Sequence, residues 1–245
     1  MKKLELIAVP VLCNGDMLLR HFRSIDVPLK RYFILDNSCG TDDSVEKAID
    51  TIWDTKPDHI DDVVILTSTQ NTGYAGAVNL IIRQNFDCPY WIISNFDVQY
   101  APGELHRLLH SIEELPDGAF CGTPGTDEFV TSLFTPSLLK KVGYLDENFY
   151  PAYFDDNDYR WRCQLAAAEP INFRLKYKHD TSTTINSSPH YKQANGRTFQ
   201  QNYQYYLEKW GGPPNGEVFV TPFNKKLPVD YWEYQPVRNN TLRWI

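Results

Sequence analysis

Residues 63–84 read VVILTSTQNTGYAGAVNLIIRQ, and this stretch decides the fold class of the chain. Its apolar run at 63–66 predicts a buried strand, and the pattern at 77–84 predicts a helix. The turn between them, 71–76, is rich in Asn and Gly, which is typical of a loop that joins a strand to a helix. The stretch therefore predicts one strand–loop–helix unit.

The same alternation continues on both sides of this unit. Further strands are predicted at 4–11, 31–35 and 90–94, and further helices at 16–24 and 43–53. Four strands separated by helices of about ten residues indicate βαβ units and therefore an α/β fold with a mostly parallel central sheet flanked by helices. Ligands bind at the carboxyl ends of the strands in such sheets, and the polar turns of this sequence fall there.

The second half of the chain is organised differently. A strand is predicted at 129–134 and helices at 136–142 and 155–168. We expect one domain over residues 1–212, followed by a C-terminal extension at 213–245 that packs on the domain or on a second subunit. The last helical segment before the extension is rich in aromatic side chains, namely Phe199, Tyr203, Tyr205, Tyr206 and Trp210. Their spacing predicts that Tyr203, Tyr206 and Trp210 pack onto the domain.

Length and charge narrow the class of protein. The chain has 245 residues and a net charge of −7, with 42% hydrophobic and 22% charged residues. These values are those of a soluble globular protein and exclude a disordered or fibrous chain. No block of Lys and Arg is present, so no nucleic acid is expected as a partner. An anionic ligand would need a metal ion or a local cluster of donors.

The protein is expected in the cytoplasm, without a transmembrane segment. Its longest apolar stretch, residues 4–13, is far shorter than the roughly 20 residues that span a bilayer. No cleavage site of a signal peptide follows it. The cysteines are odd in number and lack a Cys-x-x-Cys pair, which is typical of reduced thiols rather than of disulfides or a zinc site. They are Cys13, Cys39, Cys88, Cys121 and Cys163.

Asn95, Phe96 and Asp97 directly follow the strand predicted at 90–94. A carboxylate at the end of such a strand is well placed to hold Mg²⁺ or Mn²⁺, which prefer carboxylate and phosphate oxygens. A polar turn that ends the strand explains the tripeptide equally well.

A second acidic group, Asp155, Asp156 and Asp158, opens a predicted helix. The helix dipole and an i,i+4 pair with Arg162 explain Asp158 as a structural residue. Asp155 and Asp156 follow the partly apolar residues 150–154, and such surroundings raise the pKa of a carboxyl group toward the range of a general base.

Two loops complete the candidate regions. Residues 36–43 read DNSCGTDD, which a loop that caps the next helix explains. Residues 71–79 carry Asn and Gly where backbone N–H groups can approach a ligand at the start of a helix. His179 and His190 are isolated, and a structural role is the simpler account of each.

Together, in this order, the segments resemble the family 2 glycosyltransferases, nucleotide-sugar-dependent enzymes of the GT-A fold. Residues 36–42 and 71–79 are similar to the family's Asp-Asn-x-Ser-x-Asp and Asn-x-Gly…Ala-x-Asn segments, and 95–97 to its Asp-x-Asp or Asn-Pro-Asp metal motif. Residues 142–149 (VGYLDENF) resemble Val-Gly-x-Phe-Asp-Glu, and 155–162 (DDNDYRWR) resemble Glu-Asp-x-Asp-Leu-x-x-Arg. Lys209-Trp210-Gly211 is similar to rhamnosyltransferase-like members, and the resemblance covers about residues 4–212.

The sequence also departs from the family pattern at three places. Asn95 replaces the first aspartate of the metal motif, so Asp97 is left as its carboxylate. Asp155 replaces the usual glutamate, and residues 10–14 stand where many members have Tyr-Asn.

The resemblance implies a nucleotide-binding half over about 1–100 and an acceptor half over about 101–212. It implies Mn²⁺ or Mg²⁺ as cofactor, held by Asp97 with help from His179. Asp156 would deprotonate the acceptor hydroxyl, with Asp155 as the alternative base. The residues expected to bind the nucleotide sugar are Pro10, Asn14, Asp36, Asn71, Gly73, Asn79, Asn95 and Asp97.

The function implied is an inverting glycosyltransferase that moves a sugar from a nucleoside-diphosphate sugar to an acceptor hydroxyl on a glycan. A catalytically degenerate module that binds a nucleotide or glycan stays open as an alternative. A sugar nucleotidyltransferase is less favoured, since residues 10–15 hold one glycine and no basic residue. The sugar, the nucleobase, the acceptor and a homodimer are left open by the sequence, as is a role of the aromatic helix as an acceptor platform.

Overall fold

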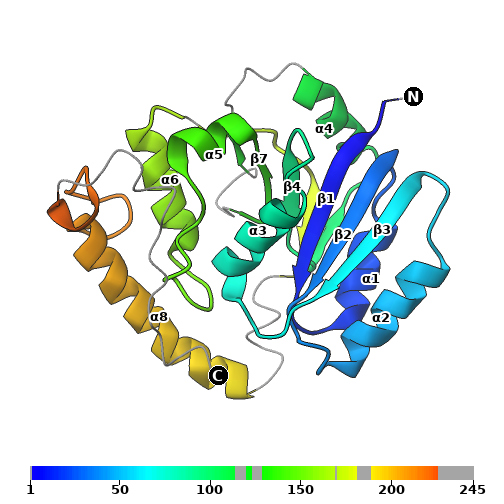
Figure 1. The fold of residues 1–245 in the computed structure, drawn as a ribbon, viewed down its shortest axis with the longest axis horizontal. Coiled ribbons are helices and arrows are strands. Elements are labelled where there is room, and N and C mark those ends of the chain that lie inside the picture. The colour runs from blue at the N-terminus through cyan, green and yellow to red at the C-terminus, as the bar shows by residue number, and fades with distance from the viewer. Residues whose placement is uncertain (1, 114–119, 123–128, 169, 181–188, 226–245) are drawn as a thin grey trace.

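The computed structural model describes residues 2–113, 120–122, 129–168, 170–180 and 189–225. Figure 1 shows their arrangement around one central sheet. The strands are β1 (Leu4–Val11), β2 (Leu29–Asp36), β3 (Ile60–Thr67), β4 (Trp91–Ser94), β5 (Val98–Tyr100), β6 (Phe120–Gly122), β7 (Thr131–Phe134), β8 (Pro170–Asn172) and β9 (Tyr177–His179). The helices are α1 (Gly15–Arg23), α2 (Asp43–Asp54), α3 (Gly73–Gln84), α4 (Glu104–Glu113), α5 (Pro136–Val142), α6 (Asp155–Leu165) and α8 (Pro189–Trp210), with a short 3₁₀ turn η1 (Pro222–Asn224).

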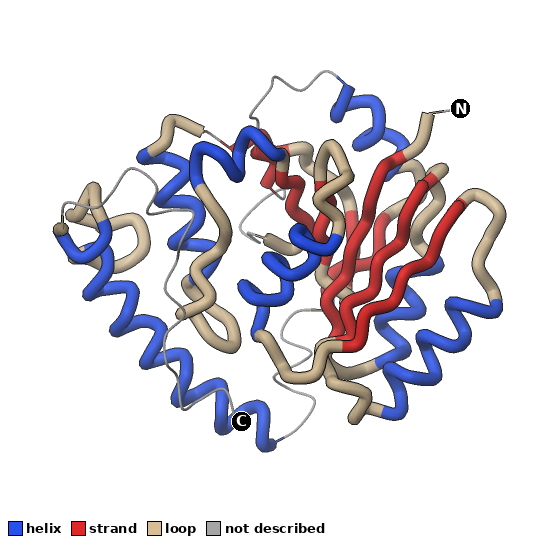
Figure 2. Tube along the Cα trace, viewed as in Figure 1, coloured by secondary structure: helices blue, strands red, loops and turns tan. Residues whose placement is uncertain are grey.

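The central sheet has the strand order β3-β2-β1-β4-β7-β6-β8. Strands β1 to β4 are mutually parallel, whereas β7 runs antiparallel to both β4 and β6. The mostly parallel α/β fold predicted from the sequence is therefore confirmed. Because β1, β2 and β3 run in register to Val11, Asp36 and Thr67, the loops that follow them leave the sheet at one edge, as Figure 2 shows.

Strand β1 is buried along almost its whole length because both faces of the sheet are covered. Successive residues of a strand point to opposite faces. Ile7 and Val9 pack with the apolar faces of α1 and α2, while Leu6 and Ala8 pack with α3. Figure 1 shows α1 and α2 on one side of the sheet and α3 on the other.

A second, two-stranded sheet pairs β5 with β9. It was not predicted from the sequence, because two strands of three residues each carry no periodicity of their own. The pairing places Val98 opposite His179, although 81 positions separate them in the chain. This small sheet therefore joins the end of β4 to a distant part of the second half.

Helix α8 packs on the domain through an aromatic cluster, as predicted. Tyr206 and Trp210 are fully buried, and Tyr203 is partly buried in the same cluster. Phe149 and Phe154, which lie in the segment that leads into α6, form its other side. The role of an acceptor platform is not needed to explain Tyr206 and Trp210.

Four fully buried charged side chains lie behind this cluster. The Lys209 ammonium contacts Asp146 at 2.7 Å and Asp158 at 2.6 Å. Asp158 also pairs with Arg162 at 2.8 Å, which confirms the predicted i,i+4 pair. Two positive and two negative charges thus balance without solvent and link α8, α6 and the loop after α5, where isolated charges would be costly.

The part of the C-terminal extension that the structure describes folds back on α8. The backbone N–H groups of Val218 and Phe219 both donate to the Trp210 carbonyl at 2.9 Å, and Trp161 of α6 donates to the Phe219 carbonyl at 3.2 Å. Phe223 packs against Tyr205 with ring centroids 5.8 Å apart. The remainder of the extension, from 226, lies outside the described residues.

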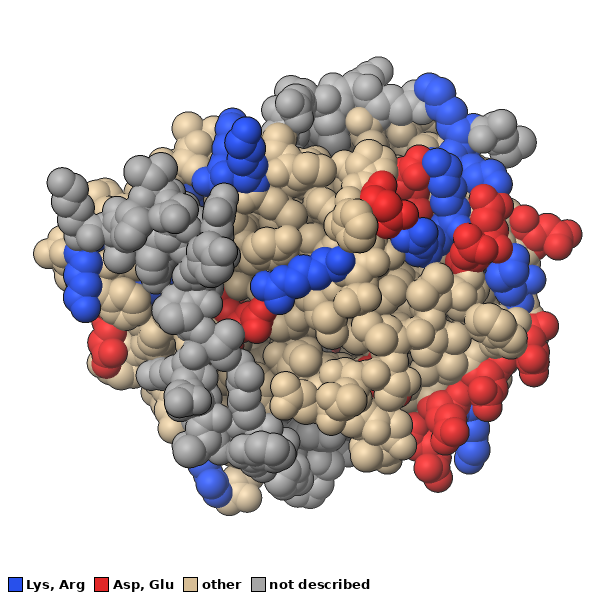
Figure 3. Space-filling view, viewed as in Figure 1, with Lys and Arg blue, Asp and Glu red and all other residues tan. Residues whose placement is uncertain are grey.

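Charged side chains of both signs gather over the amino ends of β1, β2 and β3, at the upper right of Figure 3. They form the ion pairs Lys3–Asp61, Lys30–Glu5 and Arg31–Asp87. Within the described part of the chain, no helix has the length and apolar character to cross a bilayer. The four cysteines whose side chains are described form no disulfide with one another.

Candidate active site

The loops after β2 and β3 are joined by Asn37 at the carboxyl edge of the sheet. Its side-chain amide donates to Asn71 Oδ1 at 3.0 Å, and its oxygen accepts from the Thr72 N–H at 2.9 Å. The same Asn71 oxygen accepts from the Gly73 N–H at 2.9 Å. Asn37 was not predicted as a site residue. Its place beside Asp36 indicated a functional loop, but its partners lie 34 and 35 positions away and cannot be inferred from the sequence. Asn37 fixes the start of α3.

Asp36 shapes the first of these loops. It is only 4% exposed, and its carboxylate accepts from the N–H groups of Ser38 at 2.9 Å and Gly40 at 3.3 Å. The structure thus gives Asp36 a role in holding the loop at 36–40. The expected contact with a base or ribose stays a prediction.

Gly73 lies where α3 approaches the segment before the acid pair. Its φ of +70° is strained for other residues, and a Cβ there would lie 2.8 Å from the Pro151 carbonyl oxygen. The neighbouring Tyr74 N–H donates to that oxygen at 2.7 Å. Gly73 therefore lets the start of α3 contact residues 150–151, so the structure brings this predicted site residue next to the acidic segment.

Two predicted nucleotide contacts are turned inward. Asn79 is 1% exposed; its amide donates to the Leu145 carbonyl at 2.9 Å and to Glu147 at 3.0 Å, and it accepts from the Leu145 N–H at 3.0 Å. Pro10 is buried within β1, where it pairs with Leu35 of β2. The nucleotide contact expected of these two residues stays a prediction. Asn79 positions the loop after α5.

Asn14 and Asn95 lie at the open edge and are half-buried. Asn14 precedes α1 with φ +64°, a left-handed conformation that asparagine tolerates better than most residues, and its side chain makes no capping hydrogen bond. The Asn95 N–H donates to the Val130 carbonyl at 2.8 Å, which fixes the turn after β4. The nucleotide-binding role expected of both side chains stays a prediction.

Asp97 and His179, the two predicted metal ligands, meet in the structure. His179 Nε2 lies 3.3 Å from Asp97 Oδ1, and the two side chains are 12% and 9% exposed. The β5–β9 pairing brings them together, and the Asp180 N–H donates to the Asp97 carbonyl oxygen at 3.3 Å. Sequence reasoning named both residues without seeing the small sheet that brings them together. Their role as metal ligands stays a prediction.

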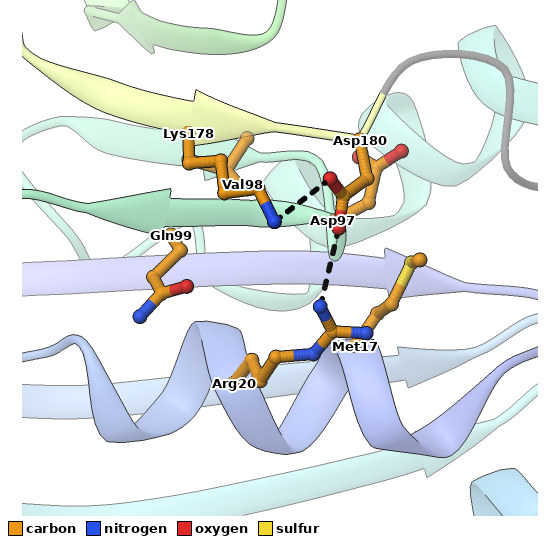
Figure 4. A pocket seen from close by; sticks show the side chains of 7 residues that line it. All are labelled: Met17, Arg20, Asp97, Val98, Gln99, Lys178 and Asp180. Carbon is orange, nitrogen blue, oxygen red and sulfur yellow. Dashed lines mark hydrogen bonds and ion pairs between the residues drawn. The ribbon is translucent and has the colours of Figure 1, made fainter.

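A small hollow adjoins Asp97 on the side of α1, as Figure 4 shows. Asp180 lies in it between two cations, 3.2 Å from Arg20 and 3.3 Å from Lys178. Its charge is thereby offset. The hollow is lined by Met17, Arg20, Asp97, Val98, Gln99, Lys178 and Asp180.

The acid pair opens α6 in unequal surroundings. Asp155 is 4% exposed, whereas Asp156 is half-buried. Burial, and then the charge of Asp156, raise the pKa of the Asp155 carboxyl well above its usual range. Burial also raises the pKa of Asp156. Of the two, Asp156 is the more exposed carboxyl group.

The turn before the acid pair is held in an unfavourable conformation. Tyr153 and Phe154 have φ values of 77° and 67°, and neither is a residue that tolerates the left-handed region well. Each such residue costs about 1–3 kcal/mol and persists where its surroundings enforce it. Strained turns of this kind cluster at functional sites.

Tyr74 connects the acid pair with the metal motif. Its hydroxyl donates to the Phe129 carbonyl at 2.9 Å. Burial raises the pKa of Tyr74 well above its usual range, and the carboxylates of Asp155, Asp156 and Asp97 raise it further. The charges of all three carboxylates therefore act on this one hydroxyl group.

The chemistry of this site suits a divalent cation shared with a substrate. No cluster of three or more His, Cys, Asp or Glu side chains that could hold a metal occurs among the described residues. One carboxylate and one imidazole are too few for a cation held by protein alone. Mg²⁺-type cations are commonly bound by one or two carboxylates together with substrate phosphates. Asp97 and His179 fit that arrangement.

Comparison with known proteins agrees with this geometry. The model of the family described as "Glycosyl transferase family 2" matches residues 7–164. A galactofuranosyl glycosyltransferase of Leishmania donovani is 21% identical over an alignment of 335 residues, which covers 98% of this chain and 76% of the relative. The crystal structure of S. aureus TarS covers 89% of this chain with a TM-score of 0.52 and 13% identity. This chain spans only 41% of the TarS chain.

The class of protein follows from these findings. The fold is that of the GT-A glycosyltransferases, with the site at the carboxyl edge of the sheet. The chain belongs to glycosyl transferase family 2 and is a glycosyltransferase.

Proposed function

We propose that the protein is an inverting glycosyltransferase that moves a sugar from a nucleoside-diphosphate sugar to a hydroxyl group of a carbohydrate acceptor. The observation that supports this most is the contact of Asp97 with His179 at 3.3 Å, at the same end of the sheet at which the start of α3 contacts the segment before Asp155 and Asp156. A metal-binding carboxylate and a raised-pKa carboxyl pair at one site are the groups that such a transfer needs.

The donor lies, in this proposal, along the carboxyl edge of the sheet between Asn14 and Asp97. Asp97 and His179 hold Mn²⁺ or Mg²⁺ there together with the diphosphate. When bound, such a cation offsets the negative charge that develops on the leaving nucleoside diphosphate. The negative net charge of the chain makes a cation, or a local cluster of donors, necessary for such an anionic ligand.

Asp156 acts as the base in a single displacement. As the acceptor oxygen forms its bond to the anomeric carbon, the bond from that carbon to the diphosphate oxygen breaks. The acceptor proton passes to the Asp156 carboxylate, and the electron pair of the broken bond leaves with the nucleoside diphosphate. One displacement inverts the anomeric centre. The raised pKa of Asp156 makes it a stronger base than an exposed aspartate.

The experiment measures release of nucleoside diphosphate from a panel of nucleotide sugars, with Mn²⁺, Mg²⁺ or EDTA. A galactofuranose donor belongs in the panel because the Leishmania relative is named as a galactofuranosyl enzyme. We expect metal-dependent release from at least one donor, faster with its carbohydrate acceptor. Binding of a nucleotide sugar without release under any condition would favour the degenerate binding module instead.

A further inference from the structure

We propose that Asn202 of α8 is a positioning residue for the acid pair, because it holds the turn at 152–154 from which Asp155 and Asp156 extend. The inference rests on the proposed function and adds to it a residue from outside the segment that the family model matches, 7–164.

The Asn202 side chain is buried against this turn. It is 2% exposed, and its amide donates to the Ala152 carbonyl at 2.8 Å and to the Tyr153 carbonyl at 3.5 Å. A buried carbonyl group without a hydrogen-bond donor destabilises the fold, so the Asn202 amide stabilises the turn by donating to both carbonyls. Asn202 therefore contacts the backbone of the turn and not the carboxyl groups themselves.

The turn needs such a hold because of its conformation. Tyr153 and Phe154 both have positive φ values in the left-handed region. On its other side, the Pro151 carbonyl accepts from the Tyr74 N–H at 2.7 Å. The turn is thus clamped between the start of α3 and the middle of α8.

The side chains of the same turn reinforce the clamp. The Phe154 ring lies 5.0 Å from that of Phe199, 5.4 Å from that of Tyr203 and 5.9 Å from that of Tyr206, measured between centroids. All three partners belong to α8. The rings fix where Phe154 lies, while Asn202 fixes the backbone that precedes it.

The position of Phe154 determines the position of the acid pair. The Asp158 N–H donates to the Phe154 carbonyl at 2.9 Å, so the first turn of α6 begins from this carbonyl. Any relaxation of the turn at 152–154 would shift Asp155 and Asp156 together. A displacement of about 1 Å in a reacting group can reduce the rate about 10²-fold.

The experiment uses three variants at one position and one control. Asn202→Ala removes the donor, Asn202→Ser keeps a shorter donor, and Asn202→Asp keeps the size but places a carboxylate against two carbonyl groups. Gln204→Ala is the matched control, because Gln204 lies on the exposed face of the same helix and bonds only to Glu208 among the described residues. Asn202→Ser serves as the test if the other two variants do not fold.

The first measurement is hydrogen exchange of the peptide that spans residues 152–160. We expect exchange in this peptide to rise about tenfold in Asn202→Ala, less in Asn202→Ser, and not at all in Gln204→Ala. Unchanged exchange in every folded Asn202 variant would overturn the proposal. This measurement needs no substrate, so it separates a failure here from a failure of the proposed function.

The second measurement is steady-state turnover of the donor found active in the panel. We expect kcat to fall about tenfold or more in Asn202→Ala while the KM for the donor changes by less than about twofold. A merely structural role would lower the fraction of active protein. In that case kcat would not fall in the same order in which hydrogen exchange rises across the Asn202 variants. Wild-type kcat in Asn202→Ala would overturn the positioning role.

Discussion

Asp155 and Asp156 are neighbours in the sequence but differ in how deeply their side chains are buried. Asp155 is buried, whereas Asp156 is half-buried. Asp158 lies two positions after Asp156, and its charge is matched by Arg162 and Lys209. At the scale of single residues, the environment rather than the residue type separates a base from a structural acid.

We predict that Asp156→Asn lowers kcat about 10²-fold or more with little change in donor affinity, because the amide keeps the size of the side chain but cannot accept the proton. Asp155→Asn should lower kcat less. Steady-state kinetics with the active donor and acceptor measure both variants. Near-normal turnover of Asp156→Asn on a genuine acceptor would show that the base is misassigned.

The same pair predicts how activity depends on pH. Burial raises the pKa of Asp156, and the base is active only when it is deprotonated. The value of kcat should therefore rise with pH through an inflection above the ordinary aspartate value of about 3.9. A pH profile of wild type and Asp156→Asn tests this, since the inflection should be absent from the variant. An inflection that persists unchanged would assign it to another group.

Asp155 carries a cost in stability that follows from its raised pKa. A carboxyl group with a higher pKa in the folded state binds protons more tightly there, so stability falls as pH rises from the unfolded-state pKa through the folded-state pKa. Asp155→Asn should raise the Tm at pH 7 and lose this advantage below about pH 4. Each kcal/mol gained corresponds to about 2–4 °C in a chain of this size. A lower Tm for the variant at pH 7 would contradict the account.

At the scale of elements, the sequence pattern predicted those strands and helices whose formation depends mainly on their own residues. Strand β1 was predicted with its observed bounds because an unbroken apolar run is typical of a strand covered on both faces. Helix α3 begins at Gly73 rather than at the predicted 77, because contact with Pro151 and Asn71 stabilises a start that propensity disfavours. Strands β5 and β9 depend entirely on each other, so neither was predictable alone.

The residues of α8 show the same limit. Thr198, Asn202, Tyr206 and Lys209 recur at three-and-four spacing and are all buried, which marks a polar stripe on the inner face of the helix. The stripe could have been read from the sequence as a sign of buried partners. Which partners they are depends on α6 and the loop after α5, which no local pattern specifies.

Lys209 tests whether α8 is an integral element. Lys209→Met should lower the free energy of unfolding by about 3–5 kcal/mol, because Asp146 and Asp158 would share the single cation Arg162 in a buried setting. Lys192→Met, at an exposed position of the same helix, is the control and should change it little. Urea unfolding measures both. Equal stability of the two variants would show that the buried charges do not hold α8.

At the scale of the whole molecule, the fold gathers groups from both halves of the chain. The sheet edge presents the loops after β1 to β4, the small sheet adds His179 to Asp97, and α6 adds the acid pair. The sequence predicted these chemical groups by their motifs. It did not predict that Asn79 would be held within the protein, because its partners Leu145 and Glu147 are set by tertiary contacts.

The central claim is that Asp97 holds a metal ion and the donor diphosphate, and titration calorimetry tests it most directly. A panel of nucleoside diphosphates is titrated into wild type, Asp97→Ala and Asp62→Ala, with Mn²⁺ and with EDTA; Asp62 is an exposed carboxylate on β3. We predict Mn²⁺-dependent binding of one nucleotide to wild type and Asp62→Ala, weakened about tenfold or more, or about 1.4 kcal/mol, in Asp97→Ala. Equal affinity of wild type and Asp97→Ala in Mn²⁺ would contradict the account.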